Sequence, residues 1–151
     1  MKWLPASRIL ADQETLYPLE FFVAATPMSF QASGRSKERW KVSVSEAARQ
    51  RVRETDELGF LDRCPLAVTV YYFPAAPMIG DIDNIVKPIV DALIHVAYMD
   101  DKDVERVVVQ KFEPQVDWDF SNPSDQLVAA LDTATPVVYV RVDDDLSWRV
   151  V

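Results

Sequence analysis

The chain has 151 residues, of which 49% are hydrophobic and 26% are charged, and its formal net charge is −8. This balance is typical of a globular domain and excludes a disordered or collagen-like chain. No apolar run approaches the roughly 18 residues of a membrane span, and no signal-peptide pattern opens the sequence, so we expect a cytoplasmic protein without a membrane partner. We expect one domain over residues 1–151, with a short acidic tail from about residue 143.

The first strand is predicted over residues 19–25, which are mostly apolar and aromatic. A loop follows over residues 26–34, where Pro27 and Gly34 break regular structure. We predict a helix over about residues 37–54, with Ser36 as its N-cap.

Residues 35–53 are the one basic segment of this acidic chain. They hold seven basic and two acidic side chains, a local charge of +5, which leaves −13 for the rest. A positive face of this kind can dock nucleic acid, but it is equally typical of the solvated side of an amphipathic helix, and both interpretations stay open. Trp40 could stack on a base, although packing is the commoner role of a helical tryptophan. The candidate DNA-binding residues are Arg35, Lys37, Arg39 and Lys41.

Strands and helices alternate in the remainder of the chain. We predict a strand over 66–73, a helix over about 82–97, a strand over 103–112, a short helix over 125–131 capped by Ser124 or Asn122, and a last strand over 136–142. This order predicts an α+β fold: a single domain with a mixed sheet of about four strands and helices packed on it.

Residues 80–101 carry carboxylates at both ends of the predicted central helix. Asp81 and Asp83 stand at its start, and Asp100 and Asp101 follow its end. A helix of this length holds its ends about 20 Å apart, so the two carboxylate groups can meet only if the chain folds back after the helix. The apolar residues between them recur at helical spacing, at Ile82, Ile85, Ile89, Leu93 and Val96.

The spacing of these polar residues allows two interpretations. Oxygen ligands at this density suit a hard cation such as Mg²⁺, and Lys87 beside them can balance negative charge on a phosphate. Alternatively, Asp83 or Asn84 caps the helix, Asp83, Lys87 and Asp91 form a solvated ion-pair ladder, and the later pair of aspartates makes a turn. Spacing alone does not choose between them.

Several other kinds of site are excluded by composition. The chain has three glycines, and none lies in a GxxxxGK[ST] or GxGxxG motif, so we expect no nucleotide cofactor. His95 is the only histidine, which excludes an HExxH arrangement and a histidine-rich metal site, and Cys64 is the only cysteine, which excludes an intramolecular disulfide. We assign a catalytic role to neither residue.

The central segment resembles a known family motif. Asp81-x-Asp83-Asn84-x-x-Lys87-x-x-x-Asp91-Ala92-Leu93, followed by Tyr98-x-Asp100-Asp101, is similar to the core motif of the RusA-like Holliday junction resolvases. These are small Mg²⁺-dependent endonucleases, usually encoded by phages and prophages, that act in DNA recombination and repair. The match is specific over about thirty residues and loose elsewhere.

The resemblance implies a function and a set of site residues. Asp81, Asp83 and Asp101 would be catalytic ligands of Mg²⁺ (or Mn²⁺), Lys87 would be essential for catalysis, and the role of Asp100 stays open. The implied activity is hydrolysis of DNA phosphodiesters at a four-way junction by a homodimer. The acidic net charge is a departure from the more basic members expected of this family, and it bears on junction affinity rather than on the chemistry.

Two other functions remain as alternatives. The chain could be an acidic binding or regulatory protein that keeps the fold without the cleavage activity, or a Mg²⁺-dependent nuclease that acts on flaps or other branched DNA. The acidic run Asp143–Asp145 could hold a second metal, although adjacent like charges are usually solvated chain.

Overall fold

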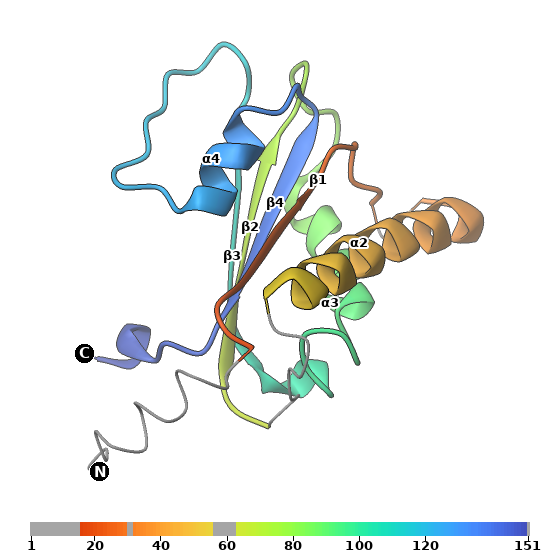
Figure 1. The fold of residues 1–151 in the computed structure, drawn as a ribbon. Coiled ribbons are helices and arrows are strands. Elements are labelled where there is room, and N and C mark those ends of the chain that lie inside the picture. Colours follow the sequence, from red (N-terminus) through yellow and green to blue (C-terminus); the bar gives the residue numbers. More distant parts are fainter. Residues whose placement is uncertain (1–15, 30–31, 56–62, 151) are drawn as a thin grey trace.

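A computed structural model of the chain describes residues 16–29, 32–55 and 63–150. Its centre is a four-stranded mixed sheet with the strand order β1-β4-β2-β3 (Figure 1). β4 pairs antiparallel with both of its neighbours, while β2 and β3 run parallel. The strands are β1 (Leu19–Val23), β2 (Leu66–Phe73), β3 (Val104–Lys111) and β4 (Val137–Asp143). The predicted α+β fold with a mixed four-stranded sheet is thus confirmed.

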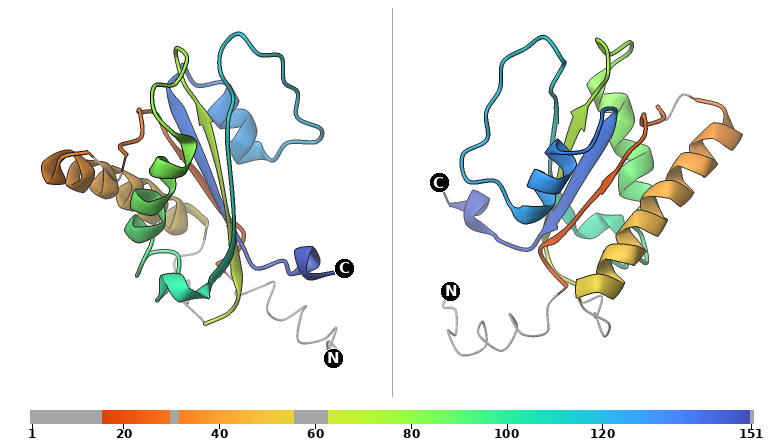
Figure 2. Two further views of the ribbon diagram at one scale, coloured as in Figure 1. Left: turned by 180° about the vertical axis from the view of Figure 1, so that it is seen from behind. Right: turned by 45° about the horizontal axis from the view of Figure 1, so that its top comes forward.

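Helices cover both faces of this sheet (Figure 2). One face carries α2 (Gly34–Thr55) and α3 (Val86–Ala92), and the other carries α4 (Asp125–Leu131). β4 contributes side chains to a hydrophobic core on each face of the sheet, because successive side chains of a strand point to opposite faces. Its residues 138, 140 and 142 belong to the large core under α2 and α3, and its residues 137 and 139 belong to the smaller aromatic core under α4.

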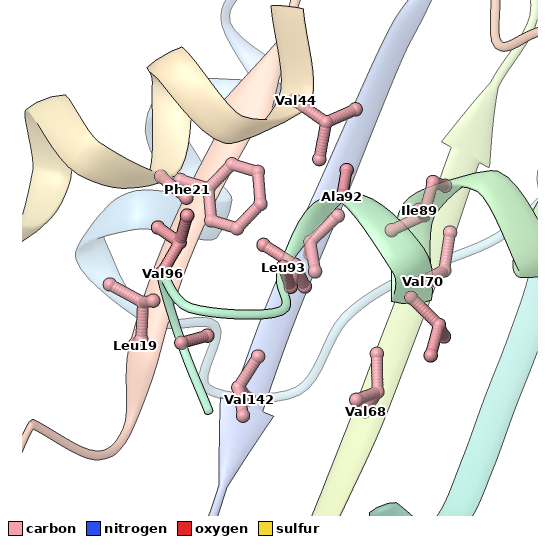
Figure 3. Packing of buried hydrophobic residues seen from close by; sticks show 14 of the residues in the cluster. Leu19, Phe21, Val44, Val68, Val70, Ile89, Ala92, Leu93, Val96 and Val142 are labelled. Carbon is pink, nitrogen blue, oxygen red and sulfur yellow. The ribbon is translucent and has the colours of Figure 1, made fainter. Parts of the chain in front are cut away.

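The large core fixes α3 on the sheet. Ile89 and Leu93 are fully buried in this core, Ile89 beside Val70 of β2, and Val44 of α2 packs in the same layer (Figure 3). Burial of an aliphatic side chain of this size contributes about 1.5–3 kcal/mol. The segment that carries the candidate site residues is therefore anchored by its apolar side.

The central helix is shorter than predicted. It begins as a 3₁₀ turn, η1 (Ile82–Ile85), continues as α3 and ends at Ala92 instead of residue 97. Pro88 has no N–H for the carbonyl of Asn84, which explains why the turn before it, Ile82–Ile85, is 3₁₀ and why the regular α-helix begins only at Val86. The chain then turns at His95, whose φ is +69° and whose N–H donates to the carbonyl of Tyr98 at 2.6 Å.

Two cap predictions are wrong and one is confirmed. Ser33, not Ser36, caps α2, because its hydroxyl accepts the N–H of Ser36 at 3.2 Å. Neither Asp83 nor Asn84 caps the central helix. The residue at the N-cap position is Asp81 for η1 and Ile85 for α3, and neither makes a side-chain capping bond. Ser124 caps α4 as predicted, accepting the N–H of Leu127 at 3.2 Å.

Two further features bear on the sequence-based interpretation. Trp40 is only 4% exposed within the large core, so it packs and does not offer a face for base stacking. Across the described ranges of the chain, none of the helices combines the length and apolarity that crossing a membrane requires.

Candidate active site

Lys87 stands between two carboxylates that come from different parts of the chain. Its ammonium nitrogen lies 2.8 Å from Oδ1 of Asp91, one turn further along α3, and 3.8 Å from Oδ2 of Asp101. The Lys87 side chain is 61% exposed, so a ligand can reach it. The chain therefore folds back after the helix, which is the condition set by the separation of the two carboxylate groups, and the return brings Asp101 close to Lys87.

Buried tyrosines hold the returning segment in place. Tyr98 is fully buried, and its hydroxyl donates to the carbonyl of Val90 in α3 at 2.6 Å. The hydroxyl of Tyr17 donates to the carbonyl of Ala97 at 2.5 Å. Two residues after Tyr98, the carboxylate of Asp100 accepts the N–H of Lys102 at 2.9 Å and so caps η2, the 3₁₀ turn Asp101–Asp103. These bonds fix the backbone position of Asp101.

The protonation states follow from these contacts. The hydrogen bond to Asp91, then the charges of Asp91 and Asp101, raise the pKa of Lys87 and keep it cationic. The backbone N–H of Lys102 is the main cause that lowers the pKa of the Asp100 carboxyl. Burial, reinforced by the nearby carboxylates, raises the pKa of Tyr98 and keeps its hydroxyl a neutral donor.

Asp81 and Asp83 flank the start of η1 with exposed side chains. Asp81 is extended, with φ −98° and ψ 139°, and follows Gly80, whose φ is +95°. Across the described part of the chain, neither carboxylate takes part in an ion pair or side-chain hydrogen bond. The ion-pair ladder considered from the sequence is thus reduced to the Lys87–Asp91 pair, and both aspartates remain open to a ligand.

The donor chemistry suits a hard divalent cation, because all candidate ligands are carboxylate oxygens and two of them have no protein partner. The positions of the three carboxylates suit a bound cation less well. In the ranges that the structure describes, no three His, Cys, Asp or Glu side chains stand close enough together to hold a metal ion. The structure thus brings Asp101 to Lys87 but does not assemble Asp81, Asp83 and Asp101 into a cation cage.

A pocket of about 440 Å³ opens directly beside Asp81. Its walls come from the loop after β1, at residues 26–29, and from the end of β2 with the loop that leads to η1, at residues 72–81. Sequence reasoning missed this pocket because its walls are about 45 residues apart in the chain. The Pro74-Ala75-Ala76-Pro77 run predicts the end of a strand and a loop leading to Gly80 and Asp81, but it carries no sign of the facing wall.

The candidate DNA-binding residues all lie on α2 but not on one side of it. Arg35 and Arg39 are exposed, while Lys37 and Lys41 are partly buried. Arg49 and Arg53 continue the exposed row, at positions that return to the same face of a helix. Among the described residues, no acidic side chain forms an ion pair with Arg35, Arg39 or Arg49. α2 lies beside α3, on the same face of the sheet (Figure 1).

Comparison with known proteins assigns the family. The model of the family described as "Endodeoxyribonuclease RusA" matches residues 31–116, more than half of the chain. The match includes α2, the pocket loop from β2 and every residue of the carboxylate segment. A search of curated proteins found no match. On the strength of the family match, the chain belongs to the RusA endodeoxyribonuclease family.

Proposed function

We propose that this protein is a Mg²⁺-dependent endonuclease that resolves four-way DNA junctions. Family membership carries the coarser part of this statement, a nuclease that hydrolyses DNA. The observation that best supports the finer part is the position of Lys87, an exposed amine held between Asp91 and Asp101 on the same segment as the unpaired Asp81 and Asp83.

Each residue has a distinct role in this proposal. Asp81, Asp83 and Asp101 would hold the cation, which supplies an activated water and stabilises charge on the phosphate and on the leaving oxygen. Lys87, cationic because of its neighbours, balances the charge that develops on the phosphate in the transition state. Asp91 orients Lys87 through their 2.8 Å bond. Mn²⁺ would use the same oxygen ligands.

The DNA would be held mainly by the exposed arginines of α2. Arg35 and Arg53 are eighteen residues apart, about 27 Å along a helix, which is long enough to follow several phosphates. Since the chain as a whole is acidic, DNA is attracted to this row and repelled elsewhere. We propose that Arg35 and Arg39 contact phosphates directly and that the partly buried Lys37 and Lys41 contribute less.

Resolution of a junction requires two symmetric cuts, whereas one chain carries one Lys87 and one set of carboxylates. A homodimer with twofold symmetry would place two such sites on opposing strands. We therefore include a homodimer in the proposal.

Cleavage of synthetic DNA tests the proposal. The wild-type protein is incubated with four-way junctions, flaps and duplexes in the presence of Mg²⁺ or Mn²⁺, next to Lys87→Ala and Asp83→Asn. Asp132→Asn is the matched control, because it removes an exposed carboxylate at the end of α4 on the opposite face of the sheet. We expect cut junctions with the wild type and the control, and at least a 100-fold slower reaction with the other two. Junctions left uncut with both metals would refute the proposal, and preferential cutting of flaps would replace its substrate.

One observation favours a second candidate, an acidic protein that binds its partner without cutting it. The three carboxylates do not form a cation site among the described residues. This candidate predicts that the wild type binds junctions but neither takes up Mg²⁺ nor cleaves them. A gel-shift assay with the same junctions measures the binding, and calorimetric titration measures the uptake of Mg²⁺.

A further inference from the structure

The pocket beside Asp81 has the chemistry of a nucleobase site. Pro27, Pro74 and Pro77 give it flat, apolar walls, and Met78 adds a polarisable side chain. Thr26 and Asn84 supply polar groups at the wall. A nucleobase needs this combination, because its faces are apolar and its edge carries hydrogen-bonding groups.

The interior of the pocket is built on the rigid part of the fold. Tyr72 and Ile85, two of its lining residues, are 5% and 2% exposed and belong to the large core. Burial raises the pKa of the Tyr72 phenol, and a hydrogen bond with Thr26 partly offsets the rise, so the phenol remains a neutral hydroxyl at the wall. A site backed by packed residues keeps its shape when a ligand enters.

The loop that forms the outer wall is tied to β3. The N–H of Met78 donates to Oε2 of Glu113 at 2.8 Å, and Lys111 lies 3.2 Å from the same oxygen. These contacts fix the position of the outer-wall loop relative to the end of β3.

Ile79 marks the rim of the pocket. Its side chain is 96% exposed, the highest exposure among the large hydrophobic residues described, and it stands two residues before Asp81. A hydrophobic side chain in this position has no role in the core. Exposed isoleucine, leucine and proline side chains serve as wedges between base steps in proteins that unstack DNA.

We propose that this pocket receives one unpaired nucleobase from the strand whose phosphate is bound at Asp81, with Ile79 as the wedge that separates it from its neighbour. The inference rests on the proposed nuclease function, since it assumes that DNA lies at Asp81. A base is joined to its phosphate through the sugar alone, so a pocket next to the phosphate site is within reach of the same strand. Moving a base out of the duplex costs the least free energy where its pairing and stacking are already broken, as at a branch point.

The test uses a junction with 2-aminopurine at the positions next to the branch point, whose fluorescence rises when the base leaves the stack. Ca²⁺ replaces Mg²⁺ to prevent cleavage. Ala76→Leu fills the pocket from its exposed rim, and Ile79→Ser removes the wedge. Val128→Ser is the matched control, because it removes an exposed hydrophobic side chain from α4 on the far face. We expect a rise in fluorescence with the wild type and the control, and loss of most of that rise with the other two variants.

Cleavage of the unlabelled junction in Mg²⁺, measured in parallel, separates the two proposals. A junction that is cut without any fluorescence change overturns the pocket assignment alone. A fluorescence rise that both pocket variants keep also overturns it, because the base then unstacks without entering the pocket. If the fluorescence rise is lost in the two pocket variants but the wild type does not cleave the junction, the pocket assignment is supported and the nuclease function is overturned. If the wild type shows neither a fluorescence rise nor cleavage, both proposals are overturned.

Discussion

Replacing Tyr98 by phenylalanine tests how the returning segment is held beside Lys87. The change removes the 2.6 Å hydrogen bond to the Val90 carbonyl and leaves that buried acceptor with only a 3.3 Å bond from the N–H of Leu93. A buried hydrogen bond contributes about 0.5–1.5 kcal/mol, and an acceptor left partly unsatisfied costs up to about 3 kcal/mol. We therefore expect the free energy of unfolding to fall by about 1–2 kcal/mol, and Tm to fall by about 2–8 °C.

Urea denaturation measures this change, and an unaltered m-value shows that only stability has moved. Tyr139→Phe is the matched control: it removes a hydroxyl that donates to Glu20 beneath α4, on the opposite face of the sheet. Both variants should lose stability, but only Tyr98→Phe should weaken the Lys87–Asp101 contact. Because the charge of Asp101 raises the pKa of Lys87, a weaker contact should be measured as a lower pKa of Lys87. A Tyr98→Phe protein as stable as the wild type, with the Lys87 pKa unmoved, would refute the role given to this tyrosine.

Two further predictions concern contacts away from Lys87. Ser124→Ala removes both the N-cap of α4 and a 2.6 Å bond to Glu20, and should lower the free energy of unfolding by about 1–2 kcal/mol. Ser124→Asn should restore most of the stability, because an amide can accept the N–H of Leu127 and donate to the Glu20 carboxylate. Equal stability of all three proteins would contradict the cap. The N–H of Met78, followed by Lys111, lowers the pKa of Glu113, so its contribution to stability is complete above pH 4.5 and is lost as pH falls through the lower folded value. Urea titrations across acidic pH should show a shallower dependence for Glu113→Gln, and an unchanged profile would contradict the tether.

Local pattern predicted the elements whose residues determine their own conformation. β2 and α4 match their predicted ranges residue for residue, because β-branched residues fill the strand and Ser124 supplies a cap that acts within one turn. The predicted end of the central helix was wrong, because the observed end depends on contacts with residues beyond the helix that the apolar spacing does not reveal. The apolar spacing continues to Val96, yet His95 turns the chain so that Tyr98 can reach the carbonyl of Val90.

The same distinction applies to the candidate site. The length of the predicted helix showed that the chain must fold back if Asp101 is to approach Asp81, and the structure contains such a return; the contact that it makes, between Asp101 and Lys87, was not predicted. The pocket could not be predicted, because its two walls meet only after β1 and β2 join the same sheet through β4. The division of the basic residues into exposed arginines and partly buried Lys37 and Lys41 needed the orientation of α2, which packing on β1 and α3 sets.

The most direct test of the central claim is calorimetric titration of Mg²⁺ into the wild type and into Asp81→Asn, Asp83→Asn and Asp101→Asn, with Asp132→Asn as the control. Mn²⁺ serves as a second titrant, because it uses the same oxygen ligands. We predict saturable binding by the wild type and the control, and a marked loss of affinity in each of the other three. A wild type that binds neither cation, or three variants that bind like the wild type, would contradict the claim that these carboxylates form one metal site beside Lys87.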